Sequence, residues 1–338
     1  MGKGLQPMKS MNIYKIAKEA GVSTATVSRV INNKANISPQ TMKKVRAVLD
    51  KYNYRPSAIA RGLVYHSLNL VGVIMRDIRH PHYNSFAFTV EQQLGNNGYS
   101  CILANANNCD PSSAFKIFSE IQVDGIIIIG SDFMNEATEQ AITDYHPNTP
   151  IVFLNGYSAK PNVTSILLDD RMGIVLCVEH LLSRGRTKLV YVNDNTTDSA
   201  RRKREGFFDA MGRHGFKKCE DRVIDSVIGF EGGKLCGQAI LDRFKGDVDG
   251  VICAEDTTAL GCMRAFEKAE LRIPEDIAIT GYSNNAEYKM TNKLLTSVDT
   301  KMELMGMEAV TALCDRINGK NRAPMFTIMP ELFIGETT

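Results

Sequence analysis

The stretch that decides the fold of the N-terminal region is "NIYKIAKEAGVSTATVSRVINN", residues 12–33. Its apolar side chains recur every three or four residues, first over 13–20 and again over 24–31, as on one face of an α-helix. Gly21 stands between the two runs, where a helix ends in left-handed geometry, and Ser23 is a favourable N-cap for the second helix. Two short helices that cross at a tight turn, with Ala17 and Val27 between them, have helix-turn-helix spacing.

A third helix is predicted from "SPQTMKKVRAVLDKY", residues 38–52. Ser38 is a suitable N-cap, and Pro39 fits the first turn because its fixed φ matches the helix and its missing N–H is not needed there. The predicted apolar stripe consists of Met42, Val45, Val48, Leu49 and Tyr52.

Charge is divided unevenly along the chain. Residues 1–64 contain twelve Lys and Arg against two acids, a net charge of +10, and the remaining residues carry −8 because the whole chain carries +2. A small basic module on a mildly acidic body is typical of a nucleic-acid-binding protein with a separate second function. A merely solvated basic tail is disfavoured by the helical periodicity of the same segment. A three-helix module that binds protein remains the alternative.

The second helix of the N-terminal module is the one expected in the major groove of DNA. Its outward-facing residues Thr24, Ala25, Ser28 and Arg29 lie near its start. Arg29 can read a guanine edge, Thr24 and Ala25 can contact thymine methyl groups, and Thr26 or Ser28 can bond to phosphate.

From residue 70 onward, short apolar runs alternate with helical stretches. The runs are "LVGVIM", "SCILANA", "DGIIIIG", "PIVFLN", "KLVYVN", "DGVICA" and "DIAITGY". They are apolar throughout, as strands buried on both faces should be, and the alternating order predicts doubly wound parallel sheets. "VDGIIIIG" at 123–130 is echoed by "VDGVICAE" at 248–255. We therefore expect two similar lobes with a ligand between them, at the carboxyl ends of the strands.

The sequence predicts no enzyme and no cofactor. No GxGxxG or P-loop turn follows a strand, and neither a GxSxG elbow nor HExxH occurs. The acid pairs Asp169–Asp170 and Glu255–Asp256 each consist of adjacent residues, which rarely act on one substrate, so structural or ligand-binding roles are favoured over acid/base catalysis.

No metal site and no membrane span are predicted either. The eight cysteines are scattered without a CxxC pair, and His80 and His82 beside Pro81 lack further ligands nearby. This pattern favours reduced cysteines in a cytoplasmic protein. No apolar run approaches the roughly 18 residues needed to cross a bilayer, and no signal peptide is recognisable.

A family resemblance covers the whole chain. "IAKEAGVSTATVSRVIN" and "ISPQTMKKVRAVLDKYNYRPSAIARGL" resemble the DNA-binding headpiece of the LacI/GalR family of bacterial repressors. "LLDDRMGIVLCVEHL", "AEDTTALGCMRAFEKAELRIPEDIAITGYSN" and "PELFIGETT" resemble the effector-binding core of that family, which is similar to periplasmic sugar-binding proteins. The resemblance implies a helix-turn-helix domain at 11–54, a hinge helix and linker at 55–69, and a core at 70–338. It also implies a homodimer on a pseudo-palindromic DNA operator.

The same resemblance divides the core between two lobes. Lobe 1 is expected at about 70–184 and 299–325, and lobe 2 at about 185–298 and 326–338, with three chain crossings between them.

The linker "RPSAIARGL", residues 55–63, is unusually apolar. In the LacI/GalR family this segment is a hinge helix that folds when two copies meet over the minor groove. By resemblance Leu63 would be a wedge that unstacks and kinks the duplex, and Ala60 would allow the two copies to approach closely. The alternative is that Leu63 caps the core of lobe 1. The complete set of predicted DNA-binding residues is Ser23, Thr24, Ala25, Thr26, Ser28, Arg29, Asn32, Ser57, Ala60 and Leu63.

The resemblance also assigns an effector site. Its expected residues are His82, Tyr83, Ser131, Lys203, Glu255 and Ser283. Glu255 stands where the family usually has Asn, and Ser283 where it has an Asp that binds sugar hydroxyls. Lys203 replaces an arginine and offers a point charge in place of a planar fork. A modified sugar, amino sugar or sugar acid is therefore expected as well as a plain hexose. Alternatively Lys203 faces solvent, and Arg202 or Arg204 holds the effector.

The functional prediction is a cytoplasmic, homodimeric transcriptional repressor whose DNA affinity is controlled by a small metabolite, a sugar or sugar derivative, in the cleft. Two alternatives share parts of the pattern. A solute-binding protein for a transporter would have the same core, but the headpiece and the lack of a signal peptide argue against it. A sugar-modifying enzyme would need catalytic groups converging in the cleft, and the sequence shows none.

Overall fold

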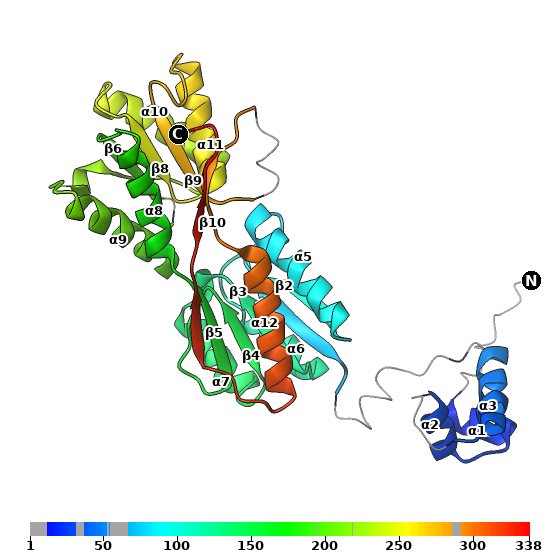
Figure 1. Ribbon diagram of the computed structural model, residues 1–338. Helices are drawn as coiled ribbons and strands as arrows, with labels where there is room; N and C mark the ends of the chain where they lie inside the picture. The colour runs from blue at the N-terminus through cyan, green and yellow to red at the C-terminus, as the bar shows by residue number, and fades with distance from the viewer. Residues whose placement is uncertain are drawn as a thin grey trace, which may run out of the picture. The chain divides into compact units, whose positions relative to one another are not determined.

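The computed structural model describes residues 12–31, 37–52, 54, 67–193, 195–217, 219–285 and 292–338. The chain divides into two compact units, Met1–Leu68 and Asn69–Thr338. The first unit is helical and the second is built of alternating strands and helices (Figure 1).

Three helices form the N-terminal unit: α1 (Ile13–Ala20), α2 (Thr24–Ile31) and α3 (Pro39–Lys51). Gly21 ends α1 with a φ of 66°, the left-handed conformation in which a Cβ is disfavoured. Ser23 accepts a hydrogen bond from the Thr26 N–H at 3.1 Å, and Ser38 accepts one from the Thr41 N–H at 3.2 Å. These caps confirm the helix starts and the turn predicted from the sequence.

A small apolar core holds the three helices together. Its buried members are Ile16, Ala17, Ala20, Val27, Val30 and Val45. The predicted stripe of α3 is wrong at its last position, because Tyr52 is 39% exposed and its hydroxyl donates to Glu19 at 3.0 Å. Lys51 donates to the same carboxylate at 2.7 Å, and Tyr54 packs against the core instead.

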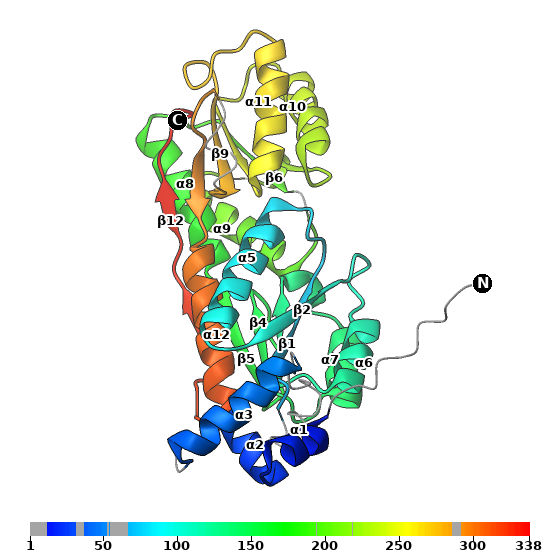
Figure 2. The same cartoon turned by 90° about the vertical axis from the view of Figure 1, so that its right-hand side faces the viewer.

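Lobe 1 of the second unit is a six-stranded parallel sheet in the order β11-β5-β4-β3-β1-β2. Its strands are β1 (Leu70–Met75), β2 (Ser100–Asn105), β3 (Gly125–Ile129), β4 (Ile151–Leu154), β5 (Val163–Leu168) and β11 (Met325–Ile328). Helices α5 (Pro81–Asn96) and α12 (Met302–Ile317) lie side by side on one face, while α6 (Ser112–Ile121) and α7 (Glu136–Tyr145) cover the other (Figure 2). Alternate strand residues such as Ile127 and Ile128 point into the two opposite cores.

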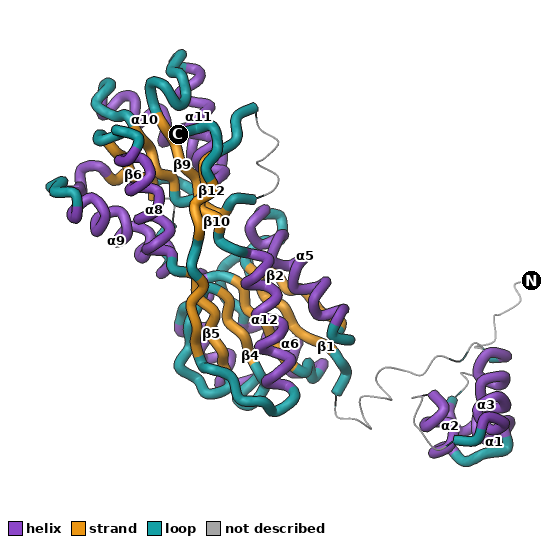
Figure 3. Tube along the Cα trace, in the orientation of Figure 1, coloured by secondary structure: helices purple, strands orange, loops and turns teal. Residues whose placement is uncertain are grey.

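Lobe 2 repeats this plan in the order β12-β10-β9-β8-β6-β7. Its strands are β6 (Leu189–Asn193), β7 (Val223–Asp225), β8 (Gly250–Cys253), β9 (Ala278–Ser283), β10 (Thr296–Asp299) and β12 (Glu331–Phe333), of which β12 is antiparallel to β10. Helices α8 (Asp170–Ser183) and α9 (Asp198–Arg213) pack on one face, and α10 (Phe230–Phe244) and α11 (Asp256–Lys268) on the other (Figure 3). The predicted fold class, a helix-turn-helix unit plus two doubly wound lobes, is confirmed.

Three details of the sequence prediction need correction. Strand β2 is not buried on both faces, because it is the edge strand of its sheet and Leu103 is 43% exposed. The first crossing between lobes lies before Asp170 and not near residue 184, since α8 packs on α9 and on the strands of lobe 2. The last crossing follows Ile328 and not residue 325, because β11 pairs with β5 in lobe 1.

Candidate functional site

A cavity with a volume of about 90 Å³ lies between the two lobes at the carboxyl ends of their strands. Loops after β1, β3 and β4 line it from lobe 1, and loops after β6, β8 and β9 line it from lobe 2. All six residues predicted for the effector site lie in its wall: His82, Tyr83, Ser131, Lys203, Glu255 and Ser283. The structure thus brings these six side chains together around one cavity. That they contact a ligand remains a prediction.

Two histidines form part of the lobe 1 wall. His80 is the N-cap of α5, and its Nδ1 accepts a hydrogen bond from the His82 N–H at 3.3 Å. The proton of the neutral His80 ring therefore sits on Nε2. That atom is buried without a hydrogen-bond partner in the described structure, and it lies 4.0 Å from Oε1 of Glu255 in lobe 2. The two lobes thus face each other here with an unbonded donor and acceptor.

His82 is a neutral ring at physiological pH. Burial, and then the electrostatic influence of His80 and Lys203, lower its pKa to about 3. Its ring meets those of Phe86 and Tyr83 edge-on at centroid distances of 5.1 and 5.4 Å. Its Nδ1 is buried without a hydrogen-bond partner among the described residues, so it is available to a ligand.

Tyr83 is fixed by a carboxylate. Its hydroxyl donates to Asp132 at 2.6 Å, and burial together with that carboxylate raises the Tyr83 pKa well above its usual value. Arg76 pairs with the other oxygen of Asp132 at 2.7 Å. Gly130 has a φ of 112°, and a Cβ at this position would lie 3.1 Å from the Tyr83 ring. Glycine is therefore needed at the turn that presents Ser131 to the cavity.

The lobe 2 wall presents a carboxylate and an ammonium group. Glu255 is the N-cap of α11, where one oxygen accepts from the Thr258 N–H at 3.1 Å. Its other oxygen, Oε1, is buried without a hydrogen-bond partner in the described ranges. Lys203 donates to the Ala254 carbonyl at 2.9 Å, and its Nζ lies 3.7 Å from the centre of the Tyr282 ring. Lys203 therefore lines the cavity, contrary to the alternative that it faces solvent.

Arg202 is engaged elsewhere. Its guanidinium pairs with the buried Asp170 at 2.9 Å, pairs with Asp198, and reaches Asn155 of lobe 1 at 3.3 Å. Tyr282 donates to the second oxygen of Asp170 at 2.8 Å. This network ties the start of α8 and α9 to the end of β4, so Arg202 joins the lobes and does not line the cavity.

A second buried carboxyl group, that of Asp256, follows Glu255 in the chain. Asp256 is 1% exposed, accepts from the Ser297 hydroxyl at 2.6 Å and accepts from the Asn285 N–H at 3.3 Å. Burial, and then the neighbouring charge of Glu255, raise its pKa to about 7. Ser283, at the end of β9, has a φ of 120°, an uncommon conformation for a residue with a side chain.

The N-terminal unit presents the start of α2 to solvent. Ala25 and Arg29 are exposed, Thr24 and Ser28 are partly exposed, and Arg29 forms no ion pair within the described ranges. Thr26 and Ser23 are joined hydroxyl to hydroxyl at 2.9 Å. Asn32, Ser57, Ala60 and Leu63, with most of the predicted hinge, lie outside the described residues.

Comparison with known proteins identifies the family. The family described as "Bacterial regulatory proteins, lacI family" matches residues 12–57, and a "Periplasmic binding protein-like domain" matches residues 178–338. The regulator reg1 of Streptomyces lividans is 31% identical, with 96% of this chain and 95% of that protein covered. The chain belongs to the LacI family.

A further relative agrees with the LacI family assignment, and a solved structure has the same fold. The repressor PurR of Pasteurella multocida is 30% identical over 95% of this chain and 97% of its own length. A lac repressor dimer, solved with its operator and the anti-inducer ONPF, is 24% identical with a TM-score of 0.86, covering 97% of this chain and 99% of that one. LacI-family proteins are transcriptional regulators, so this chain is a DNA-binding regulator and not an enzyme.

The sequence prediction missed several cavity residues. His80, Asp132, Asn155 and Asn195 line the cavity of this LacI-family core but were not predicted for it. The signal for His80 was its position before Pro81, where an N-cap residue is expected. Among the described residues no group of three or more His, Cys, Asp or Glu is arranged to hold a metal ion, and no helix is long and apolar enough to cross a membrane.

Proposed function

We propose that this LacI-family chain is a repressor that acts as a homodimer on a pseudo-palindromic operator and is controlled by a sugar or sugar derivative in the cleft. The observation that carries the proposal is the set of buried polar atoms in the cavity wall without partners in the described structure: Nε2 of His80, Nδ1 of His82 and Oε1 of Glu255. A buried polar group left unbonded costs about 1 to 3 kcal/mol, so these atoms favour a ligand that bonds to them.

The chemistry of these atoms favours hydroxyl groups. Nε2 of His80 and Nζ of Lys203 donate, whereas Oε1 of Glu255 accepts. A hydroxyl group both donates and accepts, so one hydroxyl can bridge His80 and Glu255 across their 4.0 Å separation. The His82 and Tyr83 rings offer apolar surface beside them, which suits the C–H face of a sugar.

Closure of the lobes supplies the link to DNA affinity. A ligand that bonds to His80 in lobe 1 and to Glu255 and Lys203 in lobe 2 binds more tightly when the lobes are close. Such a ligand shifts the equilibrium between open and closed lobes toward the closed form. The size of the shift is set by how much more tightly the ligand binds the closed form than the open form. The hinge proposed at 55–69 would transmit this shift, with Leu63 as its DNA wedge.

The homodimer proposal is supported by an apolar face on lobe 1. Phe88 of α5 is 66% exposed, and Leu304 and Met307 of α12 are 46% and 41% exposed. All three line one groove between the two helices. Contiguous exposed apolar surface of this kind is typical of an interface. Sedimentation equilibrium should give twice the monomer mass, and a monomer at micromolar concentration would contradict the dimer.

The DNA side is tested by fluorescence anisotropy with duplexes from the region that flanks the protein's own gene. Arg29→Ala should weaken specific binding roughly tenfold or more, because a guanine contact contributes about 1 to 3 kcal/mol. Arg264→Ala is the control, since Arg264 is an exposed arginine of α11 in the core unit. Equal binding by the wild type to specific and scrambled duplexes would contradict sequence-specific recognition.

The effector side is tested by a thermal-shift screen of sugars, amino sugars, sugar acids and sugar phosphates. A ligand of the native state raises the apparent Tm, because it stabilises the folded protein by RT ln(1 + L/Kd), where L is the free ligand concentration. The compound found should then alter operator binding. A screen in which no compound changes either the Tm or operator affinity would contradict the proposed control by a sugar.

A further inference from the structure

A second and larger cavity adjoins the cleft cavity. Its volume is about 560 Å³, and it shares Asn195, Thr197, Ala200 and Ile228 with the cleft cavity. We call it the outer cavity and the first one the inner cavity. The inner cavity alone, at about 90 Å³, is well below the roughly 300 Å³ at which small-molecule sites usually begin. A ligand held in the inner cavity therefore has room to extend outward.

Four consecutive basic residues on α9 point in different directions, as the helical turn of about 100° per residue requires. Arg201 pairs with Asp198 and Glu205 on the surface, and Arg202 pairs with Asp170. Lys203 lines the inner cavity, and Arg201 and Arg204 line the outer one. One basic run thus supplies an inter-lobe contact, one cation for the inner cavity and two for the outer cavity, of which Arg201 is already paired with two carboxylates.

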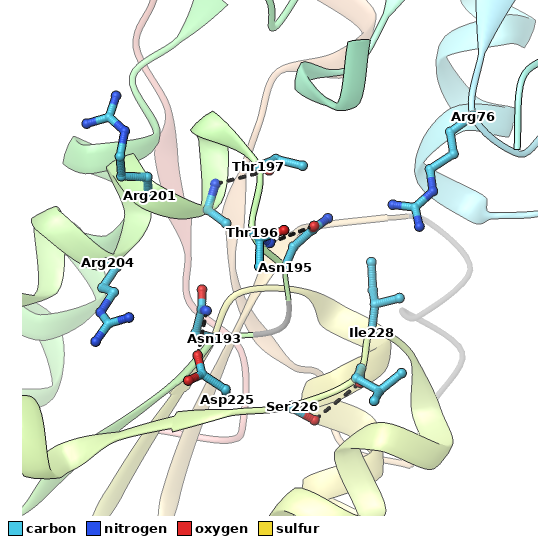
Figure 4. A pocket seen from close by; sticks show the side chains of 12 residues that line it. Arg76, Asn193, Asn195, Thr196, Thr197, Arg201, Arg204, Asp225, Ser226 and Ile228 are labelled. Atoms are coloured by element: carbon cyan, nitrogen blue, oxygen red, sulfur yellow. Dashed lines mark hydrogen bonds between the residues drawn. The ribbon is translucent and has the colours of Figure 1, made fainter. Parts of the chain in front are cut away.

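Arg204 has no ion-pair partner among the described residues, although Asp225 lines the same cavity. Its guanidinium lies 5.6 Å from the Phe208 ring, and no carboxylate of the described residues lies within ion-pair distance. Packing on an aromatic ring holds the planar group in place and leaves its edge donors free for an anion. Figure 4 shows Arg204 and Arg76 approaching the outer cavity from opposite sides.

Arg76 brings a second guanidinium, from lobe 1. It pairs with Asp132 through one terminal nitrogen at 2.7 Å. An arginine has five N–H donors, so the pair leaves donors that can reach a ligand. Arg76 is paired with Asp132, and Arg201 is paired with Asp198 and Glu205. Among the described arginines that line the outer cavity, Arg204 is therefore the one without an ion-pair partner.

The wall of the outer cavity offers an amide oxygen as an acceptor. Asn193, 8% exposed, donates from Nδ2 to Asp225 at 2.8 Å, which fixes the orientation of its amide. Its Oδ1 is buried and has no hydrogen-bond partner in the described part of the chain. A ligand hydroxyl can donate to this oxygen (Figure 4). The outer cavity therefore suits a group that carries both a hydroxyl and an anion.

We propose that the effector is an anionic two-part molecule: a hydroxylated ring in the inner cavity, joined to a second hydroxylated unit whose carboxylate or phosphate binds Arg204. Asn193 accepts from a hydroxyl of the second unit, and Arg76 contacts the anion when the lobes close. This inference rests on the proposed function, because it names the chemical class of the same effector. A charge-assisted bond to Arg204 selects the anionic molecule over its neutral counterpart roughly tenfold or more.

The test uses the full-length protein and three probes: inorganic phosphate, methyl glucuronide and methyl glucoside, each titrated at constant ionic strength. Phosphate or the glucuronide should raise the apparent Tm of the wild type, and the glucoside should do so at least tenfold less effectively. The two anions distinguish a phosphate ligand from a carboxylate ligand. Arg204→Gln should weaken anion binding about tenfold, whereas Arg213→Gln, an exposed arginine at the end of the same helix, should bind like the wild type.

Two results would overturn the inference: no anion raises the Tm of the wild type more than chloride does, or Arg204→Gln responds as the wild type does. Failure of the proposed function looks different. If anions bind through Arg204 but no compound changes operator affinity, the outer site stands and the proposed effector control fails. If a neutral sugar releases operator equally from the wild type and Arg204→Gln, effector control stands and the anionic class is wrong.

Discussion

The buried carboxyl group of Asp256 should make the core unit less stable as the pH rises from 5 to 8. Its pKa is about 7 in the folded protein, against 3.8 for an exposed Asp. Between these values the folded state holds a proton that the unfolded state has lost. The stabilisation is fully present below pH 3.8 and is lost as the pH rises through 7. Asp256→Asn removes the titration and keeps the shape of the side chain.

The magnitude follows from the size of the shift. One pKa unit corresponds to about 1.4 kcal/mol, so a shift of about three units is worth about 4 kcal/mol over the full range. Between pH 5 and 8 the wild type should lose about 2.5 kcal/mol of this contribution. For a unit of this size, 1 kcal/mol changes the Tm by roughly 2 to 4 °C. The Tm of Asp256→Asn relative to the wild type should therefore rise by about 5 °C or more.

The assay is differential scanning fluorimetry of both proteins from pH 5 to 8. Asp276→Asn is the matched control, because the Arg272 side chain lowers the pKa of Asp276 to about 2 and it does not titrate in this range. The control should follow the wild-type pH profile. A Tm difference between Asp256→Asn and the wild type that stays constant from pH 5 to 8 would refute the reasoning.

Two further changes test the inner cavity and the inter-lobe contact. Arg202→Met should destabilise the core by about 3 kcal/mol, because it leaves its buried carboxylate partner uncompensated. Arg201→Met should change the Tm little, since exposed ion pairs contribute little to stability. Equal losses of stability in Arg202→Met and Arg201→Met would contradict the role given to the buried pair. Gly130→Ala should lower stability by about 1 to 3 kcal/mol through its positive φ and its contact with Tyr83. Gly95→Ala on α5, where a Cβ meets nothing, is its control, and similar losses in both would contradict the argument.

Local chemistry made the helices of the N-terminal unit predictable. Gly21, Ser23 and Ser38 act within three or four residues of their positions, so their roles can be read from the sequence. Tyr52 was misassigned because its partner, Glu19, lies on another helix. The spacing of apolar residues along α3 alone does not show which residues of other helices its side chains contact.

The core strands show the same limit. Runs such as "DGIIIIG" mark central strands because both of their faces are buried, whereas β2 has a similar composition and lies at an edge. The three-residue strands β7 and β12 are too short to carry a comparable apolar run, and the place of β7, β11 and β12 is set by the strands that they pair with. Assignment of α8 to lobe 2 likewise depends on its packing partners.

The cavity residues were predicted through family resemblance and not through any local pattern. Lys203 and Glu255 are 52 positions apart and meet in one cavity only because α9 and α11 both start at the carboxyl edge of the same sheet. The unbonded state of Glu255 Oε1 and of the Asn193 amide oxygen depends on three-dimensional packing. The inference about an anionic effector therefore required the structure.

The most direct test of the proposed control is the operator affinity of the full-length protein with and without the compound that raises its Tm most. Anisotropy should show a change of at least tenfold in operator Kd for the wild type. Lys203→Met should bind operator normally and respond at least tenfold less to the compound, because it loses the cation of the inner cavity. An unchanged Kd in the wild type, or an undiminished response in Lys203→Met, would contradict the account.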